Sequence, residues 1–149
     1  MDPRHAAAHD AAHALVIAVH EGTRFWAPEE GGGVVRELRR EALGAASAVV
    51  TAASPAAGDA EVAWALALLD RLELTVERAR ERGVLDLGAA QELLALRVTA
   101  RRRLADLEVR ERAVAARDAL GPAPEPAGQL AAGGTRDRST SGVPRISAQ

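Results

Sequence analysis

Arginine is the residue type that offers the clearest chemistry in this chain, because all 19 basic residues are arginine and lysine is absent. The guanidinium group is planar, grips phosphate in a bidentate way and stacks on nucleic-acid bases. Two groups of arginines are dense enough to predict such contacts, and the second surrounds a run of three consecutive arginines. The candidate nucleic-acid-binding residues are Arg36, Arg39, Arg40, Arg97, Arg101, Arg102 and Arg103.

These arginines also fit an ordinary structural role. A basic set made of arginine alone is typical of a GC-rich genome, and single arginines can solvate helix faces or pair with Glu37, Glu41 and Asp106. The formal net charge is −2, so the chain as a whole does not attract polyanions. Any nucleic-acid surface must therefore be a local patch.

The last third of the chain arranges several arginines in rows. Residues seven apart lie on the same side of a helix, so Arg103, Arg110 and Arg117 form a row on one flank of the predicted last helix. A second row, on the other flank, consists of Arg97, Arg101 and Arg112.

Four histidines lie on one side of the predicted first helix: His5, His9, His13 and His20. Residues four apart on a helix are neighbours, so this spacing is open to a metal ion. Val16 lies among the histidines and no carboxylate accompanies them on that face, which favours a polar strip beside the core. Metal storage or sensing by this strip is the alternative reading.

The sequence contains no recognisable catalytic constellation. Ser47 has no histidine or acid at a useful spacing, and the paired carboxylates Glu73 and Glu77 are expected on an exposed face. The chain has no cysteine, which excludes disulfides and thiolate nucleophiles. We expect a non-enzymatic protein without a cofactor.

Composition and periodicity predict an all-α protein. The chain has 35 alanines, two tryptophans, one phenylalanine and no tyrosine, a composition that favours helix-on-helix packing. Apolar residues recur at helical spacing over residues 2–24, 34–52, 59–83 and 86–120. Asp59 and Asp86 are predicted N-caps, and Gly83 is a predicted C-terminal cap. Short turns between the helices predict an antiparallel up-down-up-down four-helix bundle over residues 1–120.

The buried faces follow from the same periodicity. The second predicted helix presents a stripe of mostly small residues, so that a neighbouring helix can approach closely: Val34, Val35, Leu38, Ala42, Ala45, Ala46, Val49 and Ala53. The last helix is expected to face the core with Leu93, Leu96, Ala100, Leu104, Leu107 and Val114. Trp64, Leu68 and Leu74 fall away from the apolar stripe of the third helix. Two of them are expected to flank the core, whereas Leu74 lies well outside the stripe and indicates a second buried surface.

Residues 121–149 differ sharply from the rest of the chain. Proline, glycine, serine and threonine dominate there without apolar periodicity, so we predict a disordered tail. No basic segment followed by a long apolar run begins the chain, and no window approaches 18 uninterrupted apolar residues. A soluble cytoplasmic protein without membrane contact is the expectation.

The order of motifs from His13 to Leu107 resembles a bacterial four-helix-bundle family. In that family a Thr-basic pair ends the first helix, and an aromatic-proline turn, an acidic pair, a glycine and a Leu-Arg-Arg helix follow. The corresponding residues here are Thr23–Arg24, Phe25–Pro28, Glu29–Glu30, Gly33 and Glu37–Ala42, and later Leu69, Leu72 and the Gly83–Leu85 turn. The family includes proteins encoded within intervening sequences of ribosomal RNA genes, and the accessory variability proteins of diversity-generating retroelements.

This resemblance implies an accessory protein that assembles as a ring-shaped homo-pentamer and contacts a reverse transcriptase together with RNA. A competing hypothesis is a protein–protein interaction module without nucleic-acid binding. That hypothesis is motivated by the off-stripe Trp64 and Leu74 and by the slightly acidic body.

Overall fold

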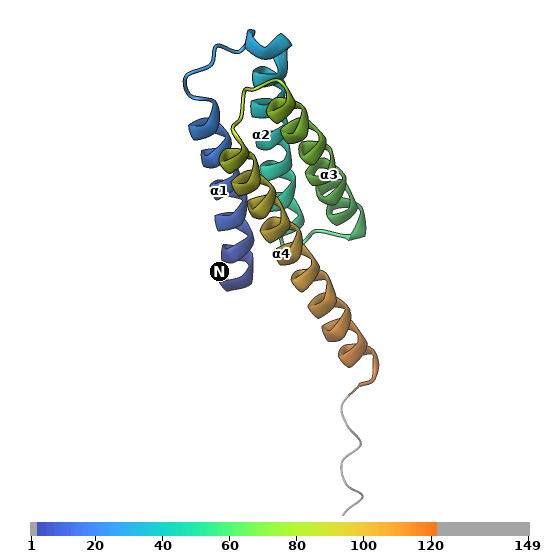
Figure 1. Ribbon diagram of the computed structural model, residues 1–149. Helices are drawn as coiled ribbons and strands as arrows, with labels where there is room; N and C mark the ends of the chain where they lie inside the picture. Colours follow the sequence, from blue (N-terminus) through green and yellow to red (C-terminus); the bar gives the residue numbers. More distant parts are fainter. Residues whose placement is uncertain (1–2, 122–149) are drawn as a thin grey trace, which may run out of the picture.

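The computed structural model describes residues 3–121 (Figure 1). Within that range the protein has four α-helices and no strand, which confirms the all-α prediction. The helices are α1 (Pro3–Thr23), α2 (Val34–Ala52), α3 (Asp59–Glu81) and α4 (Leu87–Ala119), and a short 3-10 helix, η1 (Glu30–Gly33), precedes α2. No helix in this part of the chain is long and apolar enough to cross a membrane.

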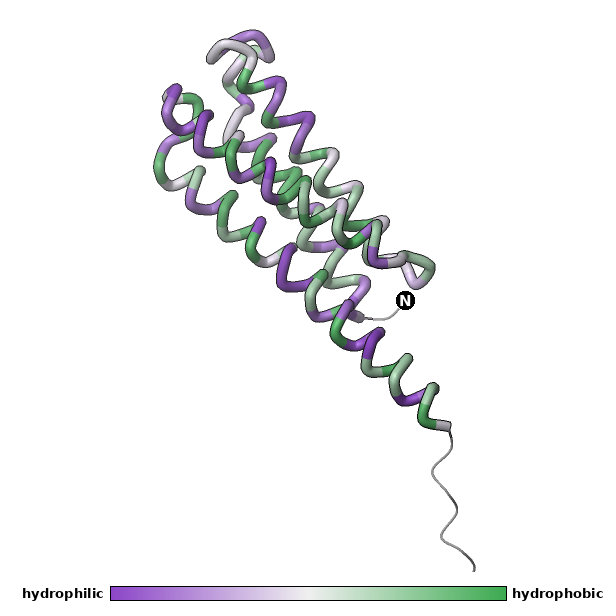
Figure 2. The backbone as a smooth tube through the Cα atoms, turned by 90° about the vertical axis from the view of Figure 1, so that its right-hand side faces the viewer, coloured by the Kyte–Doolittle hydropathy of each residue, from purple (hydrophilic) through white to green (hydrophobic). Residues whose placement is uncertain are grey.

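The four helices share one apolar core. Helix α1 contacts α2 and α4, and α3 contacts the same two helices from the other side. Leucines from every helix are fully buried, and the predicted stripe of small residues on α2 is buried along its whole length: Val34, Val35, Leu38, Ala42, Ala45, Ala46, Val49 and Ala53. Apolar and polar residues alternate along each helix with the period of its turns (Figure 2).

The helix ends explain where the chain turns. Asp86 caps α4 as predicted, since its carboxylate accepts the Ala89 N–H at 2.7 Å. Gly83 follows α3 with φ +71°, the left-handed conformation that glycine adopts at helix C-termini.

The predicted N-cap of α3 is wrong by one residue. Gly58, not Asp59, is the capping position, and its N–H donates to the carboxylate of Glu61 at 2.9 Å. Glycine has no side chain to satisfy the first N–H groups, so the acid of the first turn reaches back instead. This hydrogen bond lowers the pKa of Glu61 below its usual value of 4.5.

Helix α4 is much longer than its partners and extends past them (Figure 1). Its predicted inner face is buried only as far as Leu107. Val114 was expected to face the core, but its side chain is 49% exposed, because the neighbouring helices end before it. The predicted disordered tail, residues 121–149, lies outside the described residues except for Gly121.

Candidate nucleic-acid interface

The seven predicted arginines lie on different faces of the molecule and differ in what they bind. Arg36, Arg39 and Arg40 belong to the first half of α2, and the other four belong to the middle of α4. Their hydrogen bonds and ion pairs separate those that hold the fold together from those that are available to a ligand.

Arg39 braces the connection between α1 and α2. Its guanidinium is partly buried and donates to the Thr23 hydroxyl at 3.0 Å, the Thr23 carbonyl at 2.7 Å and the Trp26 carbonyl at 3.1 Å. These carbonyls lie at the C-terminus of α1 and just after it, where backbone acceptors lack helical partners. Its Nε and Nη2 donors are therefore occupied by the protein itself.

Arg97 and Arg101 tie α4 to α3. The side chain of Arg97 is only 11% exposed, and it donates to the Leu69 carbonyl and to Asp70, both at 2.8 Å. It also pairs with Glu73, and Arg101 pairs with Asp70. Both arginines therefore serve mainly to join two helices, although Arg101 keeps a solvent-facing side.

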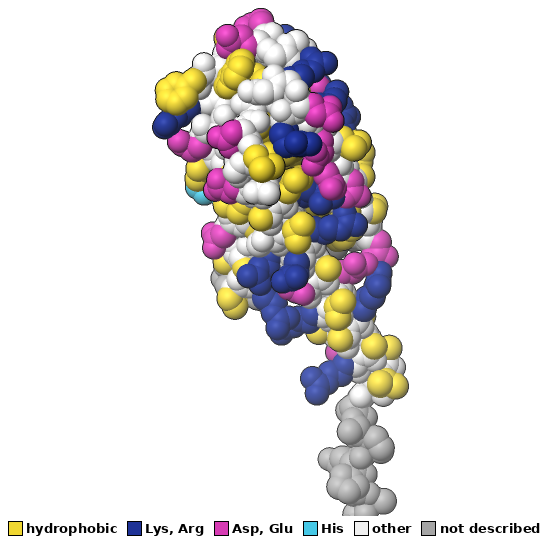
Figure 3. Space-filling view, in the orientation of Figure 1, with side chains coloured by type: hydrophobic (Ala, Val, Ile, Leu, Met, Phe, Trp, Pro, Cys, Tyr) yellow, Lys and Arg dark blue, Asp and Glu magenta, His cyan; other side chains and the backbone are white. Residues whose placement is uncertain are grey.

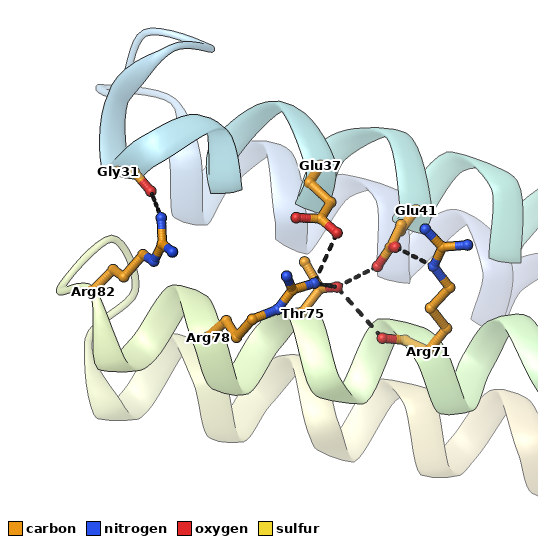
Figure 4. Close-up of polar contacts among 7 residues, drawn as sticks. All are labelled: Gly31, Glu37, Glu41, Arg71, Thr75, Arg78 and Arg82. Carbon is orange, nitrogen blue, oxygen red and sulfur yellow. Dashed lines mark hydrogen bonds and ion pairs between the residues drawn. The ribbon is translucent and has the colours of Figure 1, made fainter.

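The glutamates of α2 pair across helices rather than with the arginines of their own helix. Glu37 accepts from Arg78 at 2.7 Å, and the buried Glu41 accepts from Arg71 at 2.5 Å and from the Thr75 hydroxyl (Figure 4). Arg36 instead pairs with Glu29, at 2.6 Å, in the loop before α2. The expected pairing partners of the α2 arginines are thus bound to α3.

Three of the predicted arginines have no hydrogen bond or ion pair to another described residue. Within residues 3–121, no hydrogen bond or ion pair reaches Arg40, Arg102 or Arg103, and all three are exposed. An exposed guanidinium without a protein acceptor is the state from which phosphate is bound at the lowest cost. These three residues are the strongest part of the predicted set.

Arg103 belongs to a larger basic groove where the start of α1 meets α4. The groove has a volume of about 500 Å³ and is lined by Arg4, Arg103 and Arg110 with Asp106, over apolar walls formed by Pro3, Ala7, Val109 and Ala113. Dark blue arginine side chains gather over this part of the molecule in Figure 3. We call these residues the α1/α4 basic groove.

The candidate set omitted two residues of this groove, Arg4 and Arg110. The row of Arg103, Arg110 and Arg117 is visible in the sequence, so Arg110 could have been included from its seven-residue spacing. Arg4 could not, because it is about 100 residues from Arg103 and reaches the groove only through the packing of α1 on α4.

The histidine strip does not converge on a common point. His5 contacts the Ala53 carbonyl through Nδ1, whereas His9 and His13 line a shallow hollow between α1 and α2 beside Leu43 and Val50. Among the described residues, no three histidine, aspartate or glutamate side chains gather as ligands of one metal ion.

Comparisons with protein-family models, curated proteins and solved structures found nothing that matches this chain.

Proposed function

We propose that this protein is a non-enzymatic accessory protein of a diversity-generating retroelement that binds RNA and a reverse transcriptase as a homo-oligomer. The RNA-binding part rests on the α1/α4 basic groove. The retroelement, the reverse transcriptase and a ring of five copies rest on the family resemblance of residues 13–107. In this proposal each copy is an antiparallel up-down-up-down bundle.

The electrostatics of the groove favour a polyanion. Three guanidiniums and one carboxylate line it, so a net positive charge remains even where Asp106 forms an ion pair. The chain as a whole carries a formal charge of −2, so attraction to phosphate is confined to such patches. Apolar walls beside the guanidiniums reduce their hydration, which strengthens contacts to phosphate oxygens.

The up-down-up-down arrangement is supported by the contacts between helices. Consecutive helices α1 and α2, α2 and α3, and α3 and α4 pack together, and α1 also packs on α4. The connections between them are short, and such connections favour antiparallel neighbours.

Salt dependence of RNA binding tests the RNA-binding part. Replacing Arg103 and Arg110 by alanine should weaken binding of a single-stranded RNA oligonucleotide, as measured by fluorescence anisotropy. Each lost phosphate contact reduces the slope of log K against log salt by about 0.7, so the double variant should lose about 1.4. The matched control is Arg24→Ala with Arg80→Ala, which removes two exposed arginines that pair with neighbouring glutamates on α1 and α3. Equal slopes for the two double variants would contradict the assignment of the groove.

An outward stripe on α4 favours a second candidate, a protein–protein module without nucleic-acid binding. Leu87, Val98, Val109 and Leu120 are all exposed and recur every 11 residues, which is about three helical turns. Successive members lie about 16 Å apart along the helix and are rotated by about 20°, so they form a row of separate apolar side chains on one side of α4. Another helix that crosses or follows α4 on this side would bury these side chains, and this is the observation that favours the second candidate.

A further inference from the structure

A second groove runs between α2 and α3, on a different face from the α1/α4 basic groove. Its α2 side has a row of Arg40, Gly44, Ser47 and Thr51 with Glu41 and Ala48 beside it, and its α3 side has a row of Trp64, Leu68 and Arg71 with Glu61 beside it. Both sets follow helical spacing of four and three, so each forms one ridge along its helix. Two hollows, of about 200 and 540 Å³, share Gly44 and Leu68 as walls and therefore lie next to each other; together we call them the α2/α3 groove.

The Trp64 end of this groove is apolar and open. The Trp64 side chain is 62% exposed although it is the largest apolar residue of α3. On the α2 side of the groove, Gly44 leaves open space, since a Cβ added at Gly44 would meet nothing within 4 Å. A flat ring beside unfilled space can accept another flat ring on its face.

The other end of the groove is cationic. Arg40 is exposed and has no hydrogen-bond or ion-pair partner among residues 3–121. Within the described part of the chain, the Arg71 side chain bonds through its Nε alone, which donates to Glu41, so its two terminal nitrogens remain for another acceptor (Figure 4). The Glu41 carboxylate also lines this end and is engaged by Arg71 and Thr75, so it balances one of the two guanidiniums and leaves this end with a net positive charge of one.

We propose that the α2/α3 groove binds unpaired nucleotides of single-stranded RNA, with a base stacked on Trp64 and phosphate held by Arg40 and Arg71. The inference rests on the RNA-binding part of the proposed function and names a second contact for it. Trp64 and Arg71 are seven residues apart, about 10 Å along α3. At about 3.4 Å per stacked nucleotide, this separation corresponds to about three nucleotides.

The charges in the groove favour a base at the Trp64 end and a phosphate at the Arg40 end. Glu61 lies at the Trp64 end, where its carboxylate accepts the Gly58 N–H. A phosphate at that end would be repelled, whereas an uncharged base would not. Duplex RNA keeps its bases stacked inside the helix, so only unpaired nucleotides can reach the tryptophan ring.

Tryptophan fluorescence gives a direct test with the full chain. Titration with a single-stranded oligouridylate of about ten nucleotides should quench Trp64 emission, and an RNA duplex of equal length should not. Trp64→Phe should abolish the change in emission, because the remaining tryptophan, Trp26, does not line the groove. Binding of the RNA should be largely retained, since the phenyl ring can still stack on a base. Trp64→Leu should weaken binding of the single strand about 5- to 100-fold, the range expected for one lost base stack.

Matched variants separate the groove from general effects. Leu74→Ala alters another exposed apolar residue of α3 and should leave RNA affinity unchanged. Arg40→Gln should weaken binding several-fold, whereas Arg80→Gln, at a surface ion pair outside the groove, should not.

The possible outcomes distinguish the two proposals. RNA binding with unchanged Trp64 emission and full affinity of Trp64→Leu would overturn the groove and leave the proposed function standing. Absence of RNA binding at low salt in every form of the protein would overturn both. If Trp64→Leu changes the solution mass but not RNA affinity, the groove is a protein contact and the inference is wrong.

Discussion

At the scale of single residues, buried polar groups hold α2 and α3 in register. Glu41 and Thr75 are both buried, and the Thr75 hydroxyl donates to Glu41 and accepts from Arg78 at 3.1 Å. A buried carboxylate is tolerated only when hydrogen bonds replace its lost hydration. The Arg71 and Thr75 contacts supply these bonds, so each of them contributes to keeping the charge inside the protein.

Thr75→Val removes the hydroxyl while keeping the shape of the side chain. We expect the free energy of unfolding to fall by about 1–3 kcal/mol, because Glu41 loses a donor in a place that water does not reach. Chemical denaturation followed by circular dichroism measures this change. The control is Thr99→Val on the exposed face of α4, where the hydroxyl bonds only the Ala95 carbonyl and the expected change is within about 0.5 kcal/mol. Equal stability of the two variants would show that Thr75 does not support Glu41.

At the scale of elements, the entry to α2 depends on three consecutive glycines. Gly31, Gly32 and Gly33 all have positive φ, between +63° and +82°, a region that other residues rarely adopt. The loop they form is fixed from α3, since Arg82 donates to the Gly31 carbonyl at 2.8 Å (Figure 4). These glycines thus build a defined turn.

Alanine substitutions separate backbone strain from crowding in this turn. Gly33→Ala should cost about 1–2 kcal/mol of unfolding free energy, since a Cβ at Gly33 meets nothing within 4 Å and only the positive φ is penalised. Gly31→Ala should cost a further 1–3 kcal/mol or so, because its Cβ would lie 2.6 Å from the buried Val84 side chain.

Thermal unfolding of the two alanine variants measures the difference. Equal melting temperatures would mean that the loop moves away from Val84, and that the contact between η1 and the α3–α4 turn is not rigid.

At the scale of the whole molecule, the length of α4 leaves a surface for other copies. The outward stripe of Leu87, Val98, Val109 and Leu120 runs along the full helix, including the part beyond the core. A closed ring requires two different surfaces on each copy, and this stripe is suited to be one of them. The proposed homo-oligomer therefore has a specific test.

Light scattering after size exclusion should give a mass of several chains, five if the family resemblance extends to assembly. Val98→Glu should lower that mass, because a carboxylate in an apolar contact loses its hydration without a partner. The matched control is Thr99→Glu, which adds the same charge one position along, off the stripe, and should leave the mass unchanged. A native protein with the mass of one chain would end the oligomer proposal.

Local periodicity was sufficient to predict the helices, the buried stripe of α2 and the Asp86 and Gly83 caps. These features depend on residues three to seven positions apart, and such spacings are read directly from the chain. The Gly58 cap and the exposed Val114 could not be predicted with the same rules. The first depends on which N–H lacks a partner, and the second on where neighbouring helices end.

In the candidate site, even less could be predicted from local spacing, and more depends on how the helices pack. Composition and spacing selected arginines, but spacing along one helix does not determine which carboxylates another helix brings to them. Packing turned Arg39 and Arg97 into structural braces and placed Arg4 beside Arg103. Among residues 3–121 it left Arg40, Arg102 and Arg103 without partners. Charge pairing and groove formation join residues far apart in the sequence, so only the tertiary structure decides them.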